Sequence, residues 1–179
     1  VLYGALLPGV VIDRVASGDR RTSLLTEVSE GRLLLGYAHA EPEDRWPAAG
    51  VTTTATGASD GVTLEGVKYP VLAGDVAQKF VVSARRQDGT VGLFLADADA
   101  SGVTVDGFRT YDDRRGARVT FAGTPAVELA DGDQSAALSY AEIFTQTAQC
   151  AEAVGAMERA MELTTDYLKS RKQFGVPLK

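Results

Sequence analysis

Short runs of β-branched and aromatic residues, separated by turn residues, recur about every ten residues through the middle of the chain. The runs are Val51–Ala55, Val62–Leu64, Phe80–Ser83, Val91–Leu95, Val103–Val105 and Val119–Phe121. The turn signals between them are Ser59-Asp60-Gly61, Gln87-Asp88-Gly89 and Ala100-Ser101-Gly102, in which glycine tolerates the positive φ of a tight turn. This pattern predicts an antiparallel β-barrel or sandwich over about residues 50–125.

The hydrophobic period then lengthens from two to about 3.5, which predicts one long helix from about Gln134 to Lys172. Gly175 and Pro177 are expected to stop this helix. We call its continuous apolar stripe the helix seam, which consists of Tyr140, Ile143, Thr147, Cys150, Val154, Met157, Met161, Thr164 and Leu168. A second stripe beside the seam consists of Phe144, Ala148, Ala151 and Gly155. So wide an apolar face predicts cover by another subunit or by segments outside this sequence, the alternative being that it packs on the β domain.

The first 31 residues predict a short helical segment. An apolar entry at Leu6–Ile12 precedes an expected helix from about Thr22 to Glu30, which Gly31 ends. The three patterns together predict the α+β class, with a short N-terminal helical segment, a β middle domain and a long C-terminal helix.

Composition narrows the function classes. The net charge of −6 and the pI of about 4.8 argue against nucleic acid as a partner, and no apolar run approaches the length of about 20 residues that spans a bilayer. A single cysteine excludes an intrachain disulfide, and a single histidine, His39, makes a histidine-based metal site improbable, so no metal is expected. The chain of 179 residues starts with Val1 and shows no signal-peptide pattern, from which we expect a fragment of a cytoplasmic protein.

One catalytic motif occurs in an unsuitable context. Gly57-Ala58-Ser59-Asp60-Gly61 matches the G-x-S-x-G turn of serine hydrolases, which requires a strand-to-helix turn and a histidine base. Here the pentapeptide joins two predicted strands and His39 lies upstream, so a hairpin turn is the better interpretation.

The end of the predicted long helix carries a more specific signal. The stretch from Tyr167 to Gly175 contains Arg171 and Phe174 in the register Tyr-Leu-x-x-Arg-x-x-Phe-Gly, which resembles the signature of acyl-CoA dehydrogenases. The segment Leu33–Pro42 resembles a strand of the same family that ends in Thr-Glu-Pro, with Tyr37, Glu41 and Pro42 matching. Farther on, Leu64–Lys68 and Ala77–Ser83 resemble the family's Gly-x-Lys-x-Trp-Ile-Thr-Asn region and the strand that follows it.

The resemblance implies a fold, a cofactor and partners. It divides the chain into the end of an N-terminal helical domain (1–36), a middle β domain (37–130) and the first helix of a C-terminal helical bundle (131–179). It implies FAD as the cofactor, with Tyr37, Val71, Arg171 and Phe174 as cofactor-binding residues, the last two reaching the FAD of a neighbouring subunit. The implied partners are an acyl-CoA substrate, an electron-transfer acceptor, and further subunits in a homo- or hetero-oligomer arranged as a dimer of dimers.

The sequence departs from the family pattern where the flavin is bound. Ala40 replaces the flavin-facing threonine, Glu43–Trp46 replaces the Gly-x-Gly-Ser that follows, and Pro70-Val71-Leu72 replaces Trp-Ile-Thr. No catalytic residue is assigned, because Thr145 stands where some members carry the glutamate base and Glu142 lies about one turn away. Two interpretations follow: an FAD-dependent acyl-CoA dehydrogenase in incomplete form, or a non-catalytic partner subunit of a heteromeric one. A β-barrel ligand-binding module without redox chemistry is a third, weaker alternative.

Overall fold

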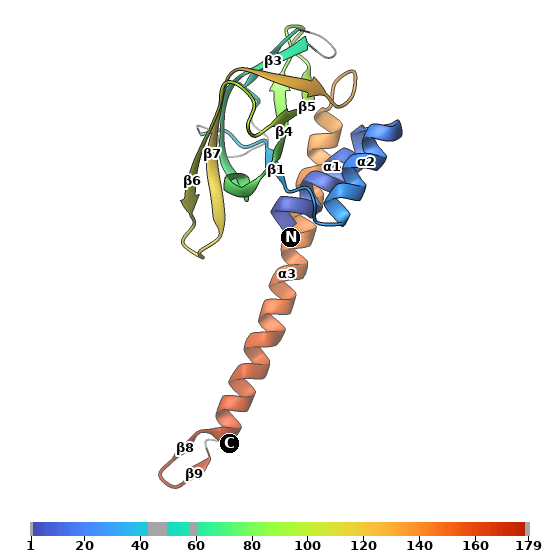
Figure 1. The fold of residues 1–179 in the computed structure, drawn as a ribbon. Helices are drawn as coiled ribbons and strands as arrows, with labels where there is room; N and C mark the ends of the chain where they lie inside the picture. Colours follow the sequence, from blue (N-terminus) through green and yellow to red (C-terminus); the bar gives the residue numbers. More distant parts are fainter. Residues whose placement is uncertain (1, 43–49, 58–60, 178–179) are drawn as a thin grey trace. The chain divides into compact units, whose positions relative to one another are not determined.

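A computed structural model describes residues 2–42, 50–57 and 61–177 of the chain (Figure 1). The chain divides into two compact units, Val1–Ala141 (unit 1) and Glu142–Lys179 (unit 2). Unit 1 contains the sheet and the N-terminal helices, and unit 2 contains most of one long helix and a small hairpin.

The described part of unit 1 contains a barrel of paired strands. Its strands are β1 (Leu35–Ala38), β2 (Thr54–Thr56), β3 (Val62–Leu72), β4 (Lys79–Arg85), β5 (Val91–Asp97), β6 (Val103–Arg109) and β7 (Arg115–Glu128). The pairings β4–β5, β5–β7, β7–β3, β3–β2 and β2–β4 form a closed circuit. β1 adds to β4, and β6 pairs with β7 outside the circuit. Closure leaves few unpaired strand edges, which stabilises a small β domain in water.

Alternating side chains fill the barrel. In β3, Val62 and Leu64 point inward and are buried, whereas Thr63 and Glu65 are exposed. Phe80 and Phe121 meet edge to face in the core, with ring centroids 6.1 Å apart. The period-two pattern that predicted the strands is therefore the pattern that makes the core.

The N-terminal residues are more helical than the sequence pattern indicates. A π-helical turn (η1, Leu2–Leu6) leads into α1 (Leu7–Val15), and α2 (Gly18–Ser29) follows. The expected short apolar entry is thus a helix, and the second helix begins at Gly18 rather than Thr22. A second hydrophobic cluster joins Val11 and Ile12 of α1 to Leu35 and Val81 of the sheet. That burial explains why a segment with little helical periodicity becomes helical.

The predicted long helix is confirmed as α3 (Ser135–Ser170). It ends two residues before Lys172, because residues 172–177 form a hairpin of β8 (Lys172–Gln173) and β9 (Val176–Pro177). Gly175, with a φ of +83°, therefore serves the hairpin turn and is not the helix cap that we expected. In unit 2 the large apolar side chains of Val154, Met157 and Met161 on α3 are exposed, whereas Phe144 and Leu168 are half-buried.

The α+β class, the β middle domain and the long helix are confirmed, but two details differ. β1–β4 and β2–β4 are parallel pairs in a sheet that was expected to be antiparallel, because β1 and β2 approach β4 from connections that are not hairpins. A short 3₁₀ turn (η4, Gly74–Val76) interrupts the β region. Residues 58–60 of the G-x-S-x-G motif and residues 43–49, including Trp46, lie outside the described residues. The division at residues 36 and 130 stays a prediction.

Candidate functional site

Two segments that depart from the family pattern lie side by side at one edge of the barrel. Ala40 follows β1, and its carbonyl oxygen accepts a hydrogen bond from the backbone N–H of Tyr69 in β3 at 2.8 Å. Pro70 follows Tyr69 directly and is exposed, and Leu72 is half-buried. We call this region the Ala40–Tyr69 edge.

The Ala40–Tyr69 edge carries an aromatic pair. The Tyr69 side chain is 39% exposed, and its ring lies 5.3 Å from that of Phe108 in β6. Phe108 lies over Gly116 of β7, where an added Cβ would come within 2.8 Å of the ring. The edge therefore presents apolar and aromatic surface, and Ala40, Pro70 and Leu72 bring no polar side chain to it.

A buried lysine lies beneath this edge. The Lys68 side chain is wholly buried, and its ammonium group donates to the His39 carbonyl oxygen at 3.1 Å, to Glu41 Oε1 at 2.7 Å and to Ser83 Oγ at 3.1 Å. An ammonium group has three N–H donors, and these three acceptors match them. Burial of a charge is costly unless it is paired and hydrogen-bonded, and both conditions are met here.

Glu41 connects the two ends of the segment between β1 and β2. Its carboxylate accepts hydrogen bonds from the backbone N–H groups of Thr52 and Thr53, each at 2.9 Å, and from both threonine hydroxyls. Burial alone would raise the pKa of Glu41, but the hydrogen bonds from Lys68 and Thr52 and the charge of Lys68 outweigh it and lower that pKa to about 2. Glu41 is therefore ionised at neutral pH and acts as a structural anion, not as a proton acceptor.

His39 extends this network toward the outside of unit 1. Its Nδ1 lies 2.8 Å from Ser83 Oγ. Ser83 Oγ also accepts a hydrogen bond from Lys68, so this hydroxyl links His39 to the buried ion pair.

Of the four predicted cofactor-binding residues, two lie in unit 1, Tyr37 and Val71, and they occupy different hydrophobic clusters. Tyr37 packs against the hydrophobic cluster under the N-terminal helices, and its hydroxyl oxygen is buried. Val71 lies wholly inside the barrel core. Val71 therefore does not line the surface of the Ala40–Tyr69 edge, and the half-buried Tyr37 packs in a different cluster from Val71.

Arg171 and Phe174 belong to unit 2. Arg171 is exposed directly after α3, and its guanidinium lies 5.9 Å from the Tyr167 ring centroid. Phe174 is fully exposed at the hairpin turn, with a φ of +53°. Thr145 and Glu142 lie on α3, and Glu142 Oε1 accepts a weak hydrogen bond from Gln146 at 3.4 Å.

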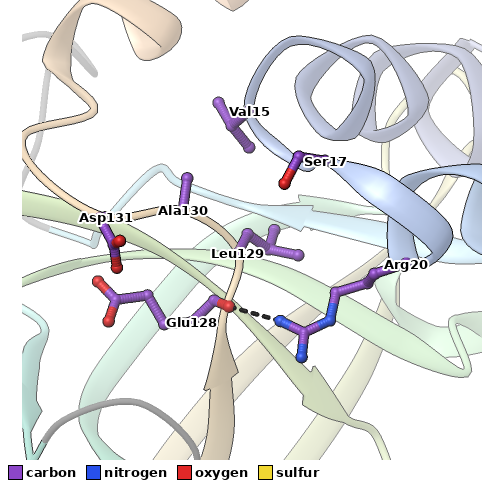
Figure 2. A pocket seen from close by; sticks show the side chains of 7 residues that line it. All are labelled: Val15, Ser17, Arg20, Glu128, Leu129, Ala130 and Asp131. Carbon is purple, nitrogen blue, oxygen red and sulfur yellow. Dashed lines mark hydrogen bonds between the residues drawn. The ribbon is translucent and has the colours of Figure 1, made fainter.

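A hollow of about 340 Å³ lies elsewhere in unit 1, between α2 and the chain that follows β7 (Figure 2). It is lined by Val15, Ser17, Arg20, Glu128, Leu129, Ala130 and Asp131. Arg20 Nη1 donates to the Glu128 carbonyl oxygen at 2.8 Å across it, as the dashed line in Figure 2 shows. The lining of the hollow contains no histidine or cysteine, and the Glu128 carboxylate pairs with Arg86, so these residues join elements and do not form a nucleophile–base pair.

The sequence analysis quoted Lys68, Ser83 and Glu41 within family motifs but assigned them no role. A signal was present, because Lys68 falls in the inward-facing alternation of Val62 and Leu64, where a charged residue needs a buried partner. Over the described residues, no cluster of three or more histidine, cysteine or acidic side chains could hold a metal ion. No described helix combines the length and apolarity that crossing a membrane requires.

The chain was compared with protein families, with curated proteins and with solved structures. No model of a protein family matches the chain. The acyl-CoA dehydrogenase FadE12 of Mycobacterium tuberculosis is 26% identical over 184 residues, which cover 95% of this chain and 47% of that protein. The chain thus spans about half the length of the curated relatives it matches.

Two solved structures share the fold. The "Tcur3481-Tcur3483 steroid ACAD G363A variant" superposes with a TM-score of 0.83 and 32% identity, covering 99% of this chain and 47% of that one. A glutaryl-CoA dehydrogenase from Mycobacterium smegmatis in complex with FADH2 superposes with a TM-score of 0.85 and 21% identity, covering 96% of this chain and 46% of that one. The chain is therefore a homologue of the acyl-CoA dehydrogenase family, and it has the fold of that family over nearly its whole length.

Proposed function

We propose that this chain forms part of an FAD-dependent acyl-CoA dehydrogenase, an oxidoreductase that introduces a double bond between the α and β carbons of an acyl-CoA thioester. The observation that carries the proposal is the 32% identity with the steroid ACAD variant over 99% of this chain. The register of Tyr167, Arg171 and Phe174 at the end of α3 supports it from the sequence alone.

FAD is the proposed cofactor, and the Ala40–Tyr69 edge is the surface on which we place its flavin ring. A flavin ring at the Ala40–Tyr69 edge would meet backbone groups and apolar surface, because Ala40, Pro70 and Leu72 offer no side-chain donor. Tyr37 and Val71 would support that contact from beneath through their packing. When bound, the flavin supplies the acceptor for the hydride that leaves the β carbon.

Two exposed residues of unit 2, Arg171 and Phe174, suit the pyrophosphate and the aromatic part of an FAD molecule. A guanidinium such as that of Arg171 binds a pyrophosphate through charge and paired N–H donors. Phe174, fully exposed, offers an aromatic face for stacking. Since these two residues reach a neighbour's FAD in the family that the sequence resembles, we propose that they serve the cofactor of a second subunit. The chain would then work only in a homo- or hetero-oligomer.

The exposed helix seam supports the same proposal. Val154, Met157 and Met161 are at least half exposed in the isolated chain. An apolar stripe of this length is costly to keep in water, and burial against another helix would stabilise an assembly by about 25 cal/mol per Å² of apolar surface covered. The seam is therefore the surface on which we expect further helices to pack.

Proton removal from the α carbon requires a base that we place outside this sequence. Thr145 has no titratable group, and the Glu142 side chain is exposed on α3. The base would come from another part of the same polypeptide or from a partner subunit. In either case the contribution of this chain is to bind and orient.

A second candidate function is a non-catalytic partner subunit of a heteromeric acyl-CoA dehydrogenase. Ala40 and Leu72 favour it, because they remove hydroxyl groups from the surface where a flavin ring would form hydrogen bonds. Each buried polar atom left without a partner costs about 1–3 kcal/mol, so the loss of two donors would weaken flavin binding appreciably. In this alternative the chain lends Arg171 and the helix seam to an active site that lies mainly in the other subunit.

Purification and assay distinguish the two functions. The full-length protein is produced alone and together with candidate partners, and its bound flavin is measured from the visible spectrum. An acyl-CoA assay with an artificial electron acceptor is run on each preparation. Flavin and activity in the protein alone support the first function, and flavin and activity only in a mixed complex support the second. A stable protein that takes up no flavin in any preparation would refute both.

A further inference from the structure

The buried Lys68 determines which way the peptide group between His39 and Ala40 points. Its ammonium group approaches the carbonyl oxygen of His39 from inside the barrel, at 3.1 Å. A peptide group is planar and trans, so the N–H of the next residue points opposite to that carbonyl. The N–H of Ala40 is thereby directed away from Lys68.

The next peptide group, between Ala40 and Glu41, is held by β3. The Ala40 carbonyl oxygen accepts the Tyr69 N–H at 2.8 Å, which fixes the peptide that follows Ala40 against β3. Glu41, which receives the second hydrogen bond of Lys68, is itself bound to the backbone N–H groups of Thr52 and Thr53. Residues 39–41 are therefore attached both to β3 and to residues 52–53, and their backbone has little freedom to turn.

We propose that Lys68 is a positioning residue that, with Glu41, holds the Ala40 N–H as a fixed donor for an acceptor atom of a heteroaromatic ring bound at the Ala40–Tyr69 edge. The inference rests on the proposed function, in which that ring is a flavin. Because the side chain of residue 40 has no donor, the orientation of this backbone N–H has more influence on ring binding than it would if a hydroxyl were present. Lys68 acts here without touching the ligand.

The test uses the full-length protein, together with any partner it needs, and three variants. Lys68→Met replaces the ammonium with an apolar chain of similar length and leaves the Glu41 carboxylate buried without its cation. The double variant Glu41→Gln/Lys68→Met removes both charges. Arg86→Met is the matched control, because it breaks the partly buried pair of Arg86 with Glu128, which is not part of the Lys68 network.

Three quantities are measured: the thermal midpoint, the Kd for FAD added to the apoprotein, and amide hydrogen exchange over residues 37–42. The single variant should lose both thermal stability and FAD affinity. The double variant should recover most of the thermal midpoint but still bind FAD about tenfold more weakly than wild type, with faster exchange over residues 37–42. The control should lower the thermal midpoint and keep the wild-type Kd.

The results distinguish a failure of the positioning role of Lys68 from a failure of the proposed FAD-dependent function. A double variant with the wild-type Kd for FAD would overturn the positioning role and leave the proposed function standing. A control variant that loses FAD affinity as strongly as the double variant would also overturn it, since general loosening of unit 1 would then explain the effect. Wild-type protein that takes up no FAD would overturn the proposed function and the inference together.

Discussion

The ion pair of Glu41 and Lys68 makes the stability of the barrel depend on pH. The ordinary pKa of this carboxyl group, 4.5, falls to about 2 in the folded protein, since the hydrogen bonds and the Lys68 charge outweigh the effect of burial. The unfolded chain therefore binds a proton at a higher pH than the folded chain does. The carboxylate stabilises the fold fully above about pH 5, and this contribution is lost as the pH falls toward 2.

The size of this contribution follows from the two pKa values. The difference between 4.5 and about 2, at about 1.4 kcal/mol for each pKa unit, corresponds to about 3 kcal/mol at neutral pH. About half of it remains at pH 3 by the same linkage relation. Glu41→Gln cannot lose a proton, so it should remove this dependence. At pH 7 it should destabilise the barrel by about 3–5 kcal/mol, because Lys68 loses its buried anionic partner.

Native-state hydrogen exchange of the β1 and β4 amides is the assay, because it reports on the barrel within a larger protein. Wild type and Glu41→Gln are compared at the same pH, which cancels the intrinsic pH dependence of exchange. The stability difference should be largest at pH 7 and should shrink by about 2 kcal/mol between pH 5 and pH 3. Asp99→Asn, which changes an exposed carboxylate after β5, should follow the wild-type curve. A difference that stays constant from pH 7 to pH 3 would refute the argument that Glu41 is held ionised.

Four other substitutions test separate parts of the molecule. Phe121→Ala should cost about 3–5 kcal/mol of unfolding free energy, measured by urea denaturation, because its ring is wholly buried against Phe80. Ala40→Thr should lower the Kd for FAD up to about tenfold in a flavin titration, since it adds a hydroxyl donor at the Ala40–Tyr69 edge. Val154→Asp should prevent assembly in light scattering, because it would bury an unpaired charge. Arg171→Ala should lower flavin occupancy in the visible spectrum while assembly persists.

Each of these predictions has a result that contradicts it. A Phe121→Ala protein within about 1 kcal/mol of wild type would mean that the core can collapse around the missing ring. Unchanged FAD affinity in Ala40→Thr would place the flavin elsewhere. Assembly of Val154→Asp would show that the helix seam is not the contact surface, with Glu152→Asp on the same exposed helix as its control. Loss of assembly in Arg171→Ala would assign that residue to the interface.

Local patterns determined much of this protein without any tertiary information. A period of two along Val62–Leu64 and its counterparts can bury only one face of a strand, and the change to a longer period near Gln134 can only be a helix. The signature at Tyr167–Gly175 is also local, so the family could be recognised from residues adjacent in sequence. The helical state of Leu7–Val15 could not be predicted in this way, because it depends on burial against Leu35 and Val81, which lie far along the chain.

The candidate site depended on the tertiary structure for the same reason. The sequence identified Ala40 and Pro70–Leu72 as departures from the family pattern, but only the packing of β1 beside β3 placed Ala40 against Tyr69. The three partners of Lys68 come from two other segments, residues 39–41 and β4, and no spacing rule relates residues 39, 41, 68 and 83. Periodicity determines which side chains face inward, since that depends on neighbours in sequence. Which buried charges meet depends on how the strands close into a barrel, and that closure is a property of the whole fold.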